Sequence, residues 1–294
     1  MKGVVVIIGA AVAATVIGAS LVSVQQPAPV KNCTIQSGTY QSFKYRGVDR
    51  KFKAYVPPGA NSQTKLIISM HGATGSSESQ EAMSGFTWFA KQQNFIAVYP
   101  QATGEPQKTV WDITPNGPDI GYVTELTKFL HYNGCGSPNT TYINGFSMGA
   151  MMTSTLMCTS GHLYAGAAMV SGVLDPLSGC VVGKNKPILI VHGVKDFVVP
   201  YDGSMSVNVA MFVPKTAISK YNRQQMARHW QLVKKPSVVT AVVQDTPLIK
   251  YVTYSSPGAK DTKIVILKDD VHVWDADPRR NTVSTTKLIL EAMK

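Results

Sequence analysis

The sequence lacks the short motifs by which many proteins hold a nucleotide or a metal ion. Neither a G-x-x-x-x-G-K-[ST] loop nor a G-x-G-x-x-G turn follows a strand-like run, so a nucleotide cofactor is not expected. The four cysteines form no C-x-x-C pair, and no Cys/His cluster has the spacing of metal ligands. We therefore expect the protein to work without a cofactor or a metal.

Acidic residues are scarce, because 17 Asp and Glu stand against 28 Lys and Arg, which gives a formal net charge of +11. A basic surface can attract anionic polymers such as acidic cell-wall polymers or nucleic acid. The cations, however, are scattered without any arginine-rich run, singly or in pairs such as Arg50-Lys51, Lys234-Lys235 and Arg279-Arg280. We interpret them as solvated surface residues and expect no nucleic-acid partner.

Linkers, repeats and low-complexity runs are also missing after the proline-containing segment Pro27–Pro29. With 44% hydrophobic residues, the 294-residue chain can fill a large core. We expect one catalytic α/β domain over residues 40–294, preceded by an N-terminal segment at residues 25–39, and a monomeric protein.

An apolar stretch opens the chain. The first residues, "MKGVVVIIGAAVAATVIGASLVSV", place one lysine before a run rich in Val, Ile and Ala, and polar "QQPAP" follows. This pattern predicts an export segment at residues 1–24, either a signal peptide or an uncleaved signal anchor, since the run is long enough to span a bilayer. The small residues Gly18, Ala19 and Ser20 favour cleavage. We predict a secreted protein that contacts a membrane only if the segment is retained.

Export makes the four cysteines informative, because an oxidising compartment favours two disulfides. Four cysteines allow three pairings. We favour Cys33 with Cys135, which would tie the N-terminal segment to the body of the protein. The second pair, Cys158 with Cys180, would staple a predicted helix to a later loop.

Short apolar runs alternate with helical patterns along the body of the chain. The apolar runs are "KLIISM", "FIAVYP", "TYIN", "AGAAMVSG" and "PILIVHG", and helices are expected near residues 78–92 and 120–132, from 147, at 217–232 and from 283. Fully apolar strands separated by helices indicate a mostly parallel sheet covered on both faces. Two strands around a turn at Gly47 precede this pattern, and "SVVTAVV", "LIKYVTYSS" and "KIVILK" continue it. We predict a doubly wound α/β fold with its site at the carboxyl ends of the strands.

One serine stands where such a fold can expose it. Gly145-Phe146-Ser147-Met148-Gly149 fits G-x-S-x-G and lies between the strand "TYIN" and a helix. The glycines permit a tight turn that would hold the Ser147 hydroxyl above the sheet, next to a helix N-terminus that favours a developing anion. The pentapeptide alone also fits an ordinary glycine-rich loop. Ser147 is our candidate nucleophile.

A second loop supports this assignment. "LIISMHGATG" ends a buried strand with His71 and a turn, which can direct the backbone N–H of Ala73 or Thr74 toward Ser147. Together with the N–H of Met148, these groups would form an oxyanion hole. We interpret His71 as structural, because the expected chain order of serine, acid and histidine requires a histidine further downstream.

Two later strand ends supply the missing partners. "ILIVHGVKDF" places Asp196 beyond one strand, and "IVILKDDVHVW" places His272 beyond another, which gives the order Ser147, Asp196, His272. His272 would act as the general base, and Asp196 would fix its tautomer. Four other carboxylates near His272 are weaker candidates for the acid, since neighbouring residues seldom point back at each other: Asp269, Asp270, Asp275 and Asp277.

Two tryptophans are candidates for contact with a substrate. Trp111 and Trp274 each fall in a loop beside a predicted functional strand, although simple packing explains them about equally well. His192, at a strand end near Asp196, is interpreted as structural. The stretch Ser204–Val213 alternates apolar residues and is expected to form one wall of the cleft.

From about Tyr40 to its end, the sequence resembles the secreted polyhydroxybutyrate-depolymerase-like, feruloyl and acetylxylan esterases of the α/β-hydrolase superfamily. The resemblance rests on "MHGATG", "YPQATG", "PDIGYV", "GFSMGAMMTSTLM", "YAGAAMVSG", "HGVKDFVVPYDG" and "VHVW", in this order. It implies an α/β-hydrolase fold, with Ser147, Asp196 and His272 at the triad positions and Ala73, Thr74 and Met148 at the oxyanion positions. The chain departs from the family pattern at Val271 and Asp275, where Gly and Pro are usual.

These features predict a secreted serine carboxylic-ester hydrolase. The loop between "AGAAMVSG" and "PILIVHG" is short, which leaves no room for a large cap domain and favours a bulky or polymeric ester. We expect a feruloyl or acetylxylan esterase acting on plant cell-wall polysaccharide. The alternatives are an extracellular poly(3-hydroxybutyrate) depolymerase and, in another class, a catalytically silent cell-surface or wall-binding protein.

Overall fold

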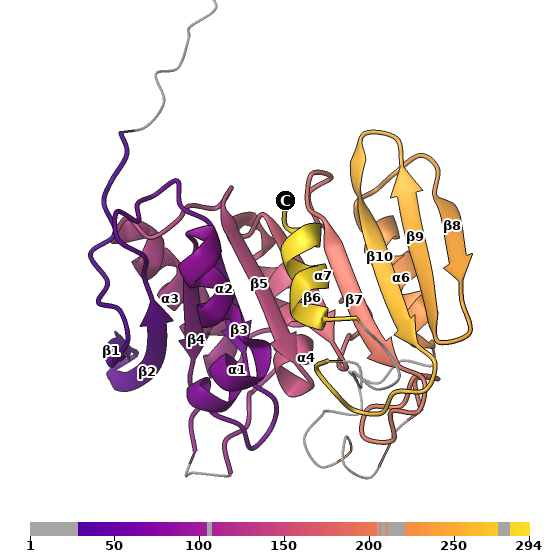
Figure 1. The fold of residues 1–294 in the computed structure, drawn as a ribbon, viewed down its shortest axis with the longest axis horizontal. Coiled ribbons are helices and arrows are strands. Elements are labelled where there is room, and N and C mark those ends of the chain that lie inside the picture. Colours follow the sequence, from indigo (N-terminus) through magenta and orange to yellow (C-terminus); the bar gives the residue numbers. More distant parts are fainter. Residues whose placement is uncertain (1–28, 105–107, 205, 207–209, 211–220, 276–282) are drawn as a thin grey trace, which may run out of the picture.

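A mixed sheet of ten strands forms the centre of the described part of the chain (Figure 1). The computed structural model describes residues 29–104, 108–204, 206, 210, 221–275 and 283–294. The strands, in chain order, are β1 (Tyr40–Tyr45), β2 (Val48–Tyr55), β3 (Leu66–Met70), β4 (Ile96–Pro100), β5 (Thr141–Phe146), β6 (Gly166–Val170), β7 (Ile188–Gly193), β8 (Thr240–Asp245), β9 (Ile249–Ser256) and β10 (Ala259–Leu267). Their spatial order is β1-β2-β4-β3-β5-β6-β7-β10-β9-β8.

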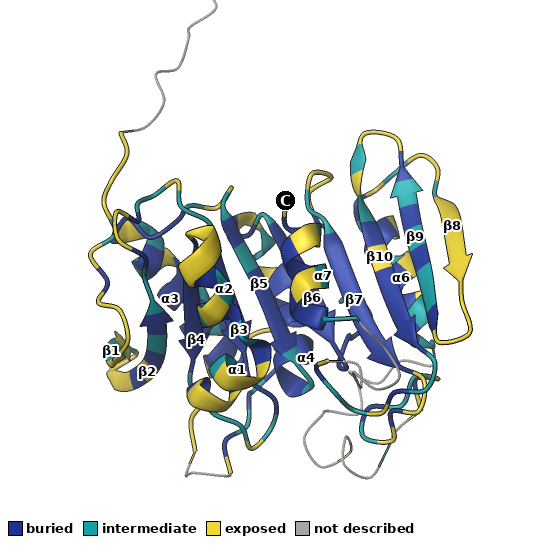
Figure 2. Cartoon of the chain, in the orientation of Figure 1, coloured by how far each residue is buried: buried dark blue, intermediate teal, exposed yellow. Residues whose placement is uncertain are grey.

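The central six strands are parallel, and antiparallel strands flank them on both sides. Every residue of β3, β4, β6 and β7 is buried, as Figure 2 shows, because helices cover both faces of the sheet at these strands. At the far edge, every residue of β8 is exposed. Continuous apolar sequence therefore marks the covered strands, as expected for parallel sheets.

Helices lie on the two faces of the sheet, with α1, α2 and α7 on one and α3, α4 and α6 on the other (Figure 1). Each face has its own apolar cluster, which contains Phe86 and Ile289 on the first face and Leu126, Met152 and Trp230 on the second. The helices are α1 (Ser77–Ser84), α2 (Phe86–Gln93), α3 (Pro118–Tyr132), α4 (Met148–Thr159), the 3₁₀ turn η1 (Gly161–Leu163), α6 (Arg223–Leu232) and α7 (Thr285–Ala292). The predicted doubly wound, mostly parallel architecture is confirmed.

The single helix expected near residues 78–92 is in fact two helices. Gly85 has φ +63°, and its N–H caps Glu81 O at the end of α1. A left-handed residue ends a helix, and the chain starts again in a new direction as α2. The glycine, rather than the hydrophobic pattern around it, therefore decides this boundary.

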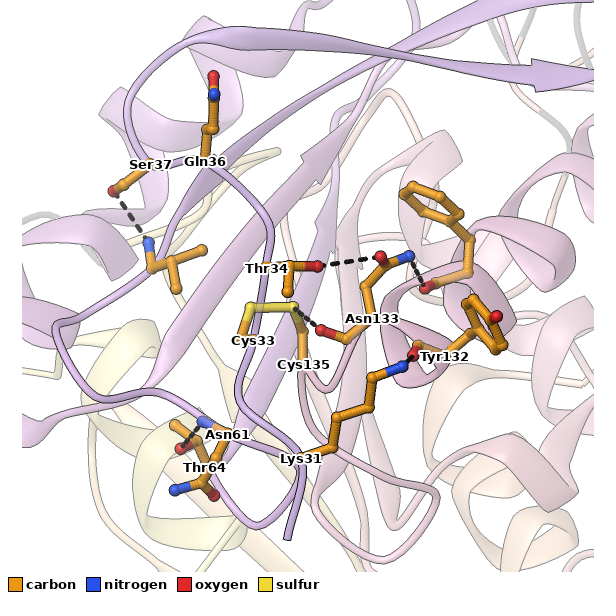
Figure 3. Close-up of a disulfide and its surroundings, with 12 residues drawn as sticks. Lys31, Cys33, Thr34, Gln36, Ser37, Asn61, Thr64, Tyr132, Asn133 and Cys135 are labelled. Carbon is orange, nitrogen blue, oxygen red and sulfur yellow. Dashed lines mark hydrogen bonds between the residues drawn. A yellow bond between two sulfur atoms is a disulfide. The ribbon is translucent and has the colours of Figure 1, made fainter.

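Both favoured disulfides are present. Cys33 is bonded to Cys135 across 102 residues, and Cys158 is bonded to Cys180 across 22 residues. Around the first bond, Thr34 Oγ1 donates to Asn133 Oδ1 (3.0 Å) (Figure 3). In the backbone, Cys33 N–H donates to Ala60 O (2.9 Å). The described part of the N-terminal segment is thus fixed beside the end of α3.

The structure describes nothing of residues 1–28, so the predicted export segment at 1–24 lies outside it. Among the residues that it does describe, none of the helices combines the length and apolarity needed to cross a bilayer. Most of the proposed cleft wall, Ser204–Val213, also lies outside the described residues.

Candidate active site

Ser147 lies in a sharp turn between β5 and α4. Its backbone has φ +53° and ψ −118°, which a residue with a side chain seldom adopts and which indicates a strained conformation. Two flanking glycines make the turn possible. A Cβ on Gly145 would lie 2.2 Å from Gly149 O, and one on Gly149 would lie 2.2 Å from Met70 O. The turn therefore needs glycine at both positions, which explains the G-x-S-x-G pattern.

The loop after β3 contacts this turn directly. A Cβ on Gly72 would lie 3.2 Å from Ser147 Cβ, so the Gly72 backbone packs tightly against the serine. Among the described residues, neither Ala73 N–H nor Met148 N–H has a hydrogen-bond partner. Met148 is the first residue of α4, where the helix dipole favours an anion. These two N–H groups are available to a developing oxyanion.

Thr74 corrects one expectation. Its N–H donates to Thr109 O at 2.6 Å, so this group is already used within the protein and is not free to bind an oxyanion. Thr74 also has φ +63°. Its role is to hold the turn against the segment that contains Thr109.

His71 is buried behind this loop and has a structural role. Its Nδ1 donates to Gly72 O (2.7 Å), and its Nε2 accepts from Ala102 N–H (3.1 Å). Burial lowers the pKa of His71, which keeps the ring neutral in agreement with this tautomer.

Trp111, predicted to line the substrate cleft, is instead 1% exposed. Its indole N–H donates to His71 O (2.8 Å), and its ring packs on the His71 ring. The expectation was wrong because Trp111 is enclosed in the interior, where it packs against His71. Trp111 therefore supports the loop after β3.

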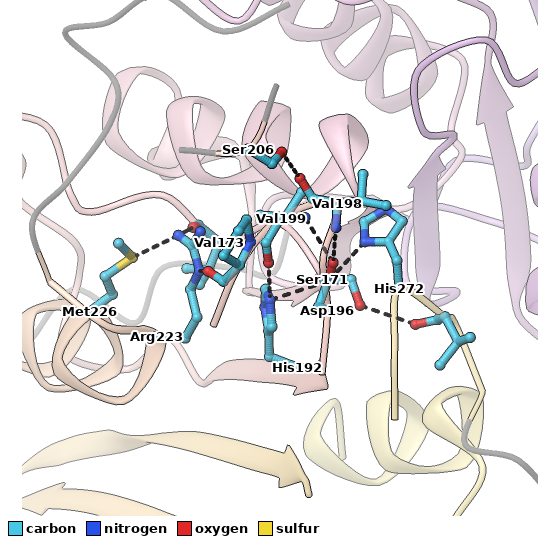
Figure 4. Close-up of polar contacts among 12 residues, drawn as sticks. Ser171, Val173, His192, Asp196, Val198, Val199, Ser206, Arg223, Met226 and His272 are labelled. Carbon is cyan, nitrogen blue, oxygen red and sulfur yellow. Dashed lines mark hydrogen bonds and ion pairs between the residues drawn. The ribbon is translucent and has the colours of Figure 1, made fainter. Parts of the chain in front are cut away.

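Asp196 and His272 form a hydrogen-bonded pair at the ends of β7 and β10 (Figure 4). His272 Nδ1 lies 2.8 Å from Asp196 Oδ2, and the Asp196 side chain is fully buried. Asp196 Oδ1 accepts two backbone N–H groups, from Val198 (2.9 Å) and Val199 (2.7 Å). The acid is therefore fixed in position and leaves His272 Nε2 as the outward nitrogen.

Two of the competing carboxylates, those of Asp269 and Asp275, have other partners. Asp269 forms an ion pair with Lys195 (2.7 Å), and Asp275 Oδ1 accepts from Thr285 N–H (2.7 Å). Asp270 O accepts from Lys195 N–H (3.0 Å), which joins the two loops side by side. Asp277 lies outside the described residues. Because β7 and β10 are parallel neighbours, the loops after them meet and bring Asp196 to His272.

Sequence reasoning missed one residue of this cluster, Arg223. Its side chain, 6% exposed, donates from Nε to Pro200 O (3.1 Å) in the acid loop and from a terminal nitrogen to Val173 O (2.9 Å) beyond β6 (Figure 4). Burial lowers the pKa of Arg223 to about 10. An arginine within the predicted helix at 217–232 carries no local pattern that distinguishes it from a surface cation.

His192 is a buried neighbour of the same aspartate, Asp196. Its Nε2 donates to Val199 O (2.8 Å) and is 3.4 Å from Asp196 Oδ2. Burial, and then the charge of Arg223, lower the pKa of His192 to about 3, so the ring is neutral. The structural role expected for His192 agrees with these contacts.

Trp274 is also buried, at 3% exposure, and its indole N–H donates to Thr286 Oγ1 (2.9 Å). It packs edge-on against Phe86 of α2. The second predicted substrate contact is therefore wrong, because α2 and α7 enclose the side chain. Trp274 anchors the loop of His272 to these helices.

The serine and the histidine are brought to the same edge of the sheet. The Phe146 ring, adjacent to Ser147 in the chain, packs 4.8 Å from the His272 ring between centroids. Ser147 N–H donates to Val170 O (2.9 Å), and Ser171 Oγ donates to Val273 O (3.1 Å), which links the three loops. Within the described chain, Ser147 Oγ makes no hydrogen bond with His272.

A metal site is absent from the part of the chain that the structure describes. No three His, Cys, Asp or Glu side chains are grouped there so that they could hold a metal ion.

The chain is similar to known carboxylic-ester hydrolases. A family model described as phospholipase/carboxylesterase matches residues 121–230. The chain is 27% identical over 164 residues to poly(3-hydroxyalkanoate) depolymerase C of Paucimonas lemoignei, covering 53% of this chain and 37% of the relative. It is 26% identical over 186 residues to a probable feruloyl esterase C of Aspergillus niger, covering 60% of this chain and 64% of the relative. The chain thus spans less than two thirds of either relative.

Among solved structures, an acetyl xylan esterase from Aspergillus awamori superposes with a TM-score of 0.58 at 15% identity, covering 87% of this chain and 99% of the other. At this identity the likeness concerns the fold. The predicted α/β-hydrolase fold and the predicted resemblance to this group of esterases are both confirmed.

Proposed function

We propose that the protein is a serine carboxylic-ester hydrolase with Ser147 as nucleophile, His272 as general base and Asp196 as the acid that orients it. One observation carries the proposal: a strained, glycine-flanked serine lies at the same sheet edge as a histidine held by a fully buried aspartate. A serine hydroxyl is a weak nucleophile without such a base. The similarity to enzymes named as esterases supports the same reaction class.

The geometry supports the usual sequence of steps for this constellation. Since His272 Nδ1–H is directed at Asp196, Nε2 is the nitrogen that would take the proton of Ser147 Oγ as this oxygen attacks the ester carbonyl. Ala73 N–H and Met148 N–H would bind the negative oxygen of the tetrahedral intermediate. His272 would then return the proton to the departing alcohol. Water, activated by the same base, would release the acid and restore Ser147.

For the substrate, we propose an ester carried by a cell-wall polysaccharide, an acetyl or feruloyl group. The named acetyl xylan esterase and feruloyl esterase support this choice. Similarity to a polyhydroxyalkanoate depolymerase favours a polyester as the second candidate. We further propose that the protein is exported, because disulfides form and persist chiefly in oxidising compartments.

The direct test is hydrolysis of p-nitrophenyl acetate and methyl ferulate by the wild type and by Ser147→Ala. Serine-dependent turnover supports the esterase, and the ratio of the two rates separates acetyl from feruloyl preference. Ser237→Ala, at an exposed serine just before β8 and away from this sheet edge, is the matched control and should keep full activity. A folded wild type without turnover on either ester would favour a silent binding protein or a strict polymer depolymerase.

A further inference from the structure

A surface hollow of about 690 Å³ lies beside the turn at Gly72, between the β1–β2 hairpin, α1 and the end of β4. Its volume falls within the range of about 300–1,000 Å³ typical of small-molecule sites. It is distinct from the Asp196–His272 pair. That pair follows β7 and β10, which lie on the other side of β5 in the strand order. Nothing in the proposed chemistry of Ser147 uses this hollow.

The hollow and the serine lie on two sides of one turn. Gly75 N–H donates to Gly72 O (3.1 Å), which closes a four-residue turn, so the two Cα atoms are less than about 7 Å apart. Gly72 contacts Ser147, whereas Thr74 and Gly75 line the hollow. A ligand in the hollow would therefore be close to an ester bound at Ser147.

The wall of the hollow is held firmly. Thr74 N–H donates to Thr109 O (2.6 Å), and Thr109 Oγ1 donates to Gly75 O (2.5 Å). The side chain of Gln101, at the end of β4, accepts from Ser77 N–H (2.8 Å). A site with a fixed wall binds without a large ordering cost.

The side chains that line the hollow suit a ligand rich in hydroxyl groups. Exposed Asp49, Lys51 and Glu78 supply acceptors and a donor, and Thr74 and Thr103 supply hydroxyls. The apolar side chain among the lining residues, other than the Tyr40 ring, is Ala102, which is buried.

Tyr40 is the aromatic residue of this wall. Tyr40, 42% exposed, offers a ring face on which a sugar ring can pack and a hydroxyl close to Glu78. Partial burial, together with Glu78, raises the pKa of Tyr40 to about 12, so its hydroxyl remains a donor across ordinary pH.

We propose that this hollow is a subsite for the carbohydrate chain that bears the ester. The inference rests on the proposed function, and it assigns to Tyr40, Lys51 and Glu78 a role in recognition of the polymer without a role in bond breaking.

The test compares two substrates on three variants. Tyr40→Ala should lower kcat/KM on an acetylated xylo-oligosaccharide about tenfold, the size expected from the loss of about 1.4 kcal/mol of binding. Turnover of p-nitrophenyl acetate, which is too small to reach the hollow, should stay unchanged. Tyr40→Phe should keep most of the oligosaccharide activity if the ring is the main contact. Tyr132→Ala, at an exposed tyrosine at the end of α3, is the control and should change neither rate.

Two outcomes would overturn the subsite. If Tyr40→Ala lowers kcat/KM equally on both substrates, Tyr40 supports the fold. If Tyr40→Ala has the wild-type kcat/KM on both substrates, the hollow is not used. Binding of unacetylated xylo-oligosaccharide to Ser147→Ala, measured by calorimetry with and without Tyr40→Ala, tests the subsite even if the wild type hydrolyses no ester. Binding of a 3-hydroxybutyrate oligomer in place of the sugar would contradict the assignment.

Discussion

His272 Nδ1 lies 2.8 Å from Asp196 Oδ2, although 76 residues separate the two in the chain. The Asp196 side chain is buried, and two backbone N–H groups fix its orientation. The tautomer and orientation of His272 are therefore decided by one carboxylate.

Asp196→Asn should lower kcat on p-nitrophenyl acetate by about 10⁴-fold, because an amide donor would favour the wrong imidazole tautomer. KM should change little, since Asp196 does not reach the substrate. Steady-state kinetics would measure both constants. Asp269→Asn, which removes a carboxylate paired with Lys195 at the surface, serves as the control, and a similar loss there would remove Asp196 from its special role.

Ser147→Gly should raise the free energy of unfolding by about 1 kcal/mol relative to Ser147→Ala, because φ +53° and ψ −118° strain a residue that has a Cβ. Both variants should lose esterase activity. Urea denaturation followed by circular dichroism would measure the difference. Equal stabilities would show that the turn stores no strain at this residue.

Arg223→Met should lower kcat about tenfold, a loss of about 1.4 kcal/mol, because the loops of Pro200 and Val173 would lose their common donor. Arg223→Lys, which keeps a charged donor at this position, should retain more activity than Arg223→Met. Steady-state kinetics on p-nitrophenyl acetate would measure both variants. An unchanged kcat in Arg223→Met would contradict a positioning role for Arg223.

Lys234 is 2% exposed, and its ammonium donates to Lys260 O (2.7 Å) and Gln231 Oε1 (3.0 Å). Burial lowers its pKa to about 7, so between pH 7 and the ordinary lysine pKa the unfolded chain binds the extra proton. The free energy of unfolding should rise with pH across this window, by up to about 1.4 kcal/mol per pH unit. Chemical denaturation at several pH values should show this slope reduced in Lys234→Met. An identical slope in the variant would contradict the lowered pKa.

Removal of either disulfide should destabilise the protein, by about 2–5 kcal/mol in the free energy of unfolding. The pair Cys33→Ala/Cys135→Ala should cost more than Cys158→Ala/Cys180→Ala, because the first bond closes a loop of 102 residues and the second one of 22. Denaturation of both double variants would test the order. Four free thiols in the unreduced wild type, by mass spectrometry, would contradict both bonds and the export proposal.

The sequence by itself determined the parts of this protein that depend on local rules. Continuous apolar runs such as Leu66–Met70 indicated covered parallel strands, because only a doubly covered strand needs apolar residues on both faces. The turn at Ser147 followed from its two glycines, since a Cβ at either would collide with backbone. The pairing of Asp196 with His272 followed from the position of each residue just after an apolar strand, in the chain order serine, acid, histidine.

Tertiary structure alone decided which polar and aromatic side chains are enclosed. Arg50, read as a surface cation, is buried and paired with Asp119 at 2.6 Å, where the hairpin of β2 meets the start of α3. Trp111 and Trp274 are buried for a similar reason, because segments distant in sequence pack against both side chains. Whether a single residue is buried depends on which helices and strands pack against it. The local sequence pattern does not identify those neighbours.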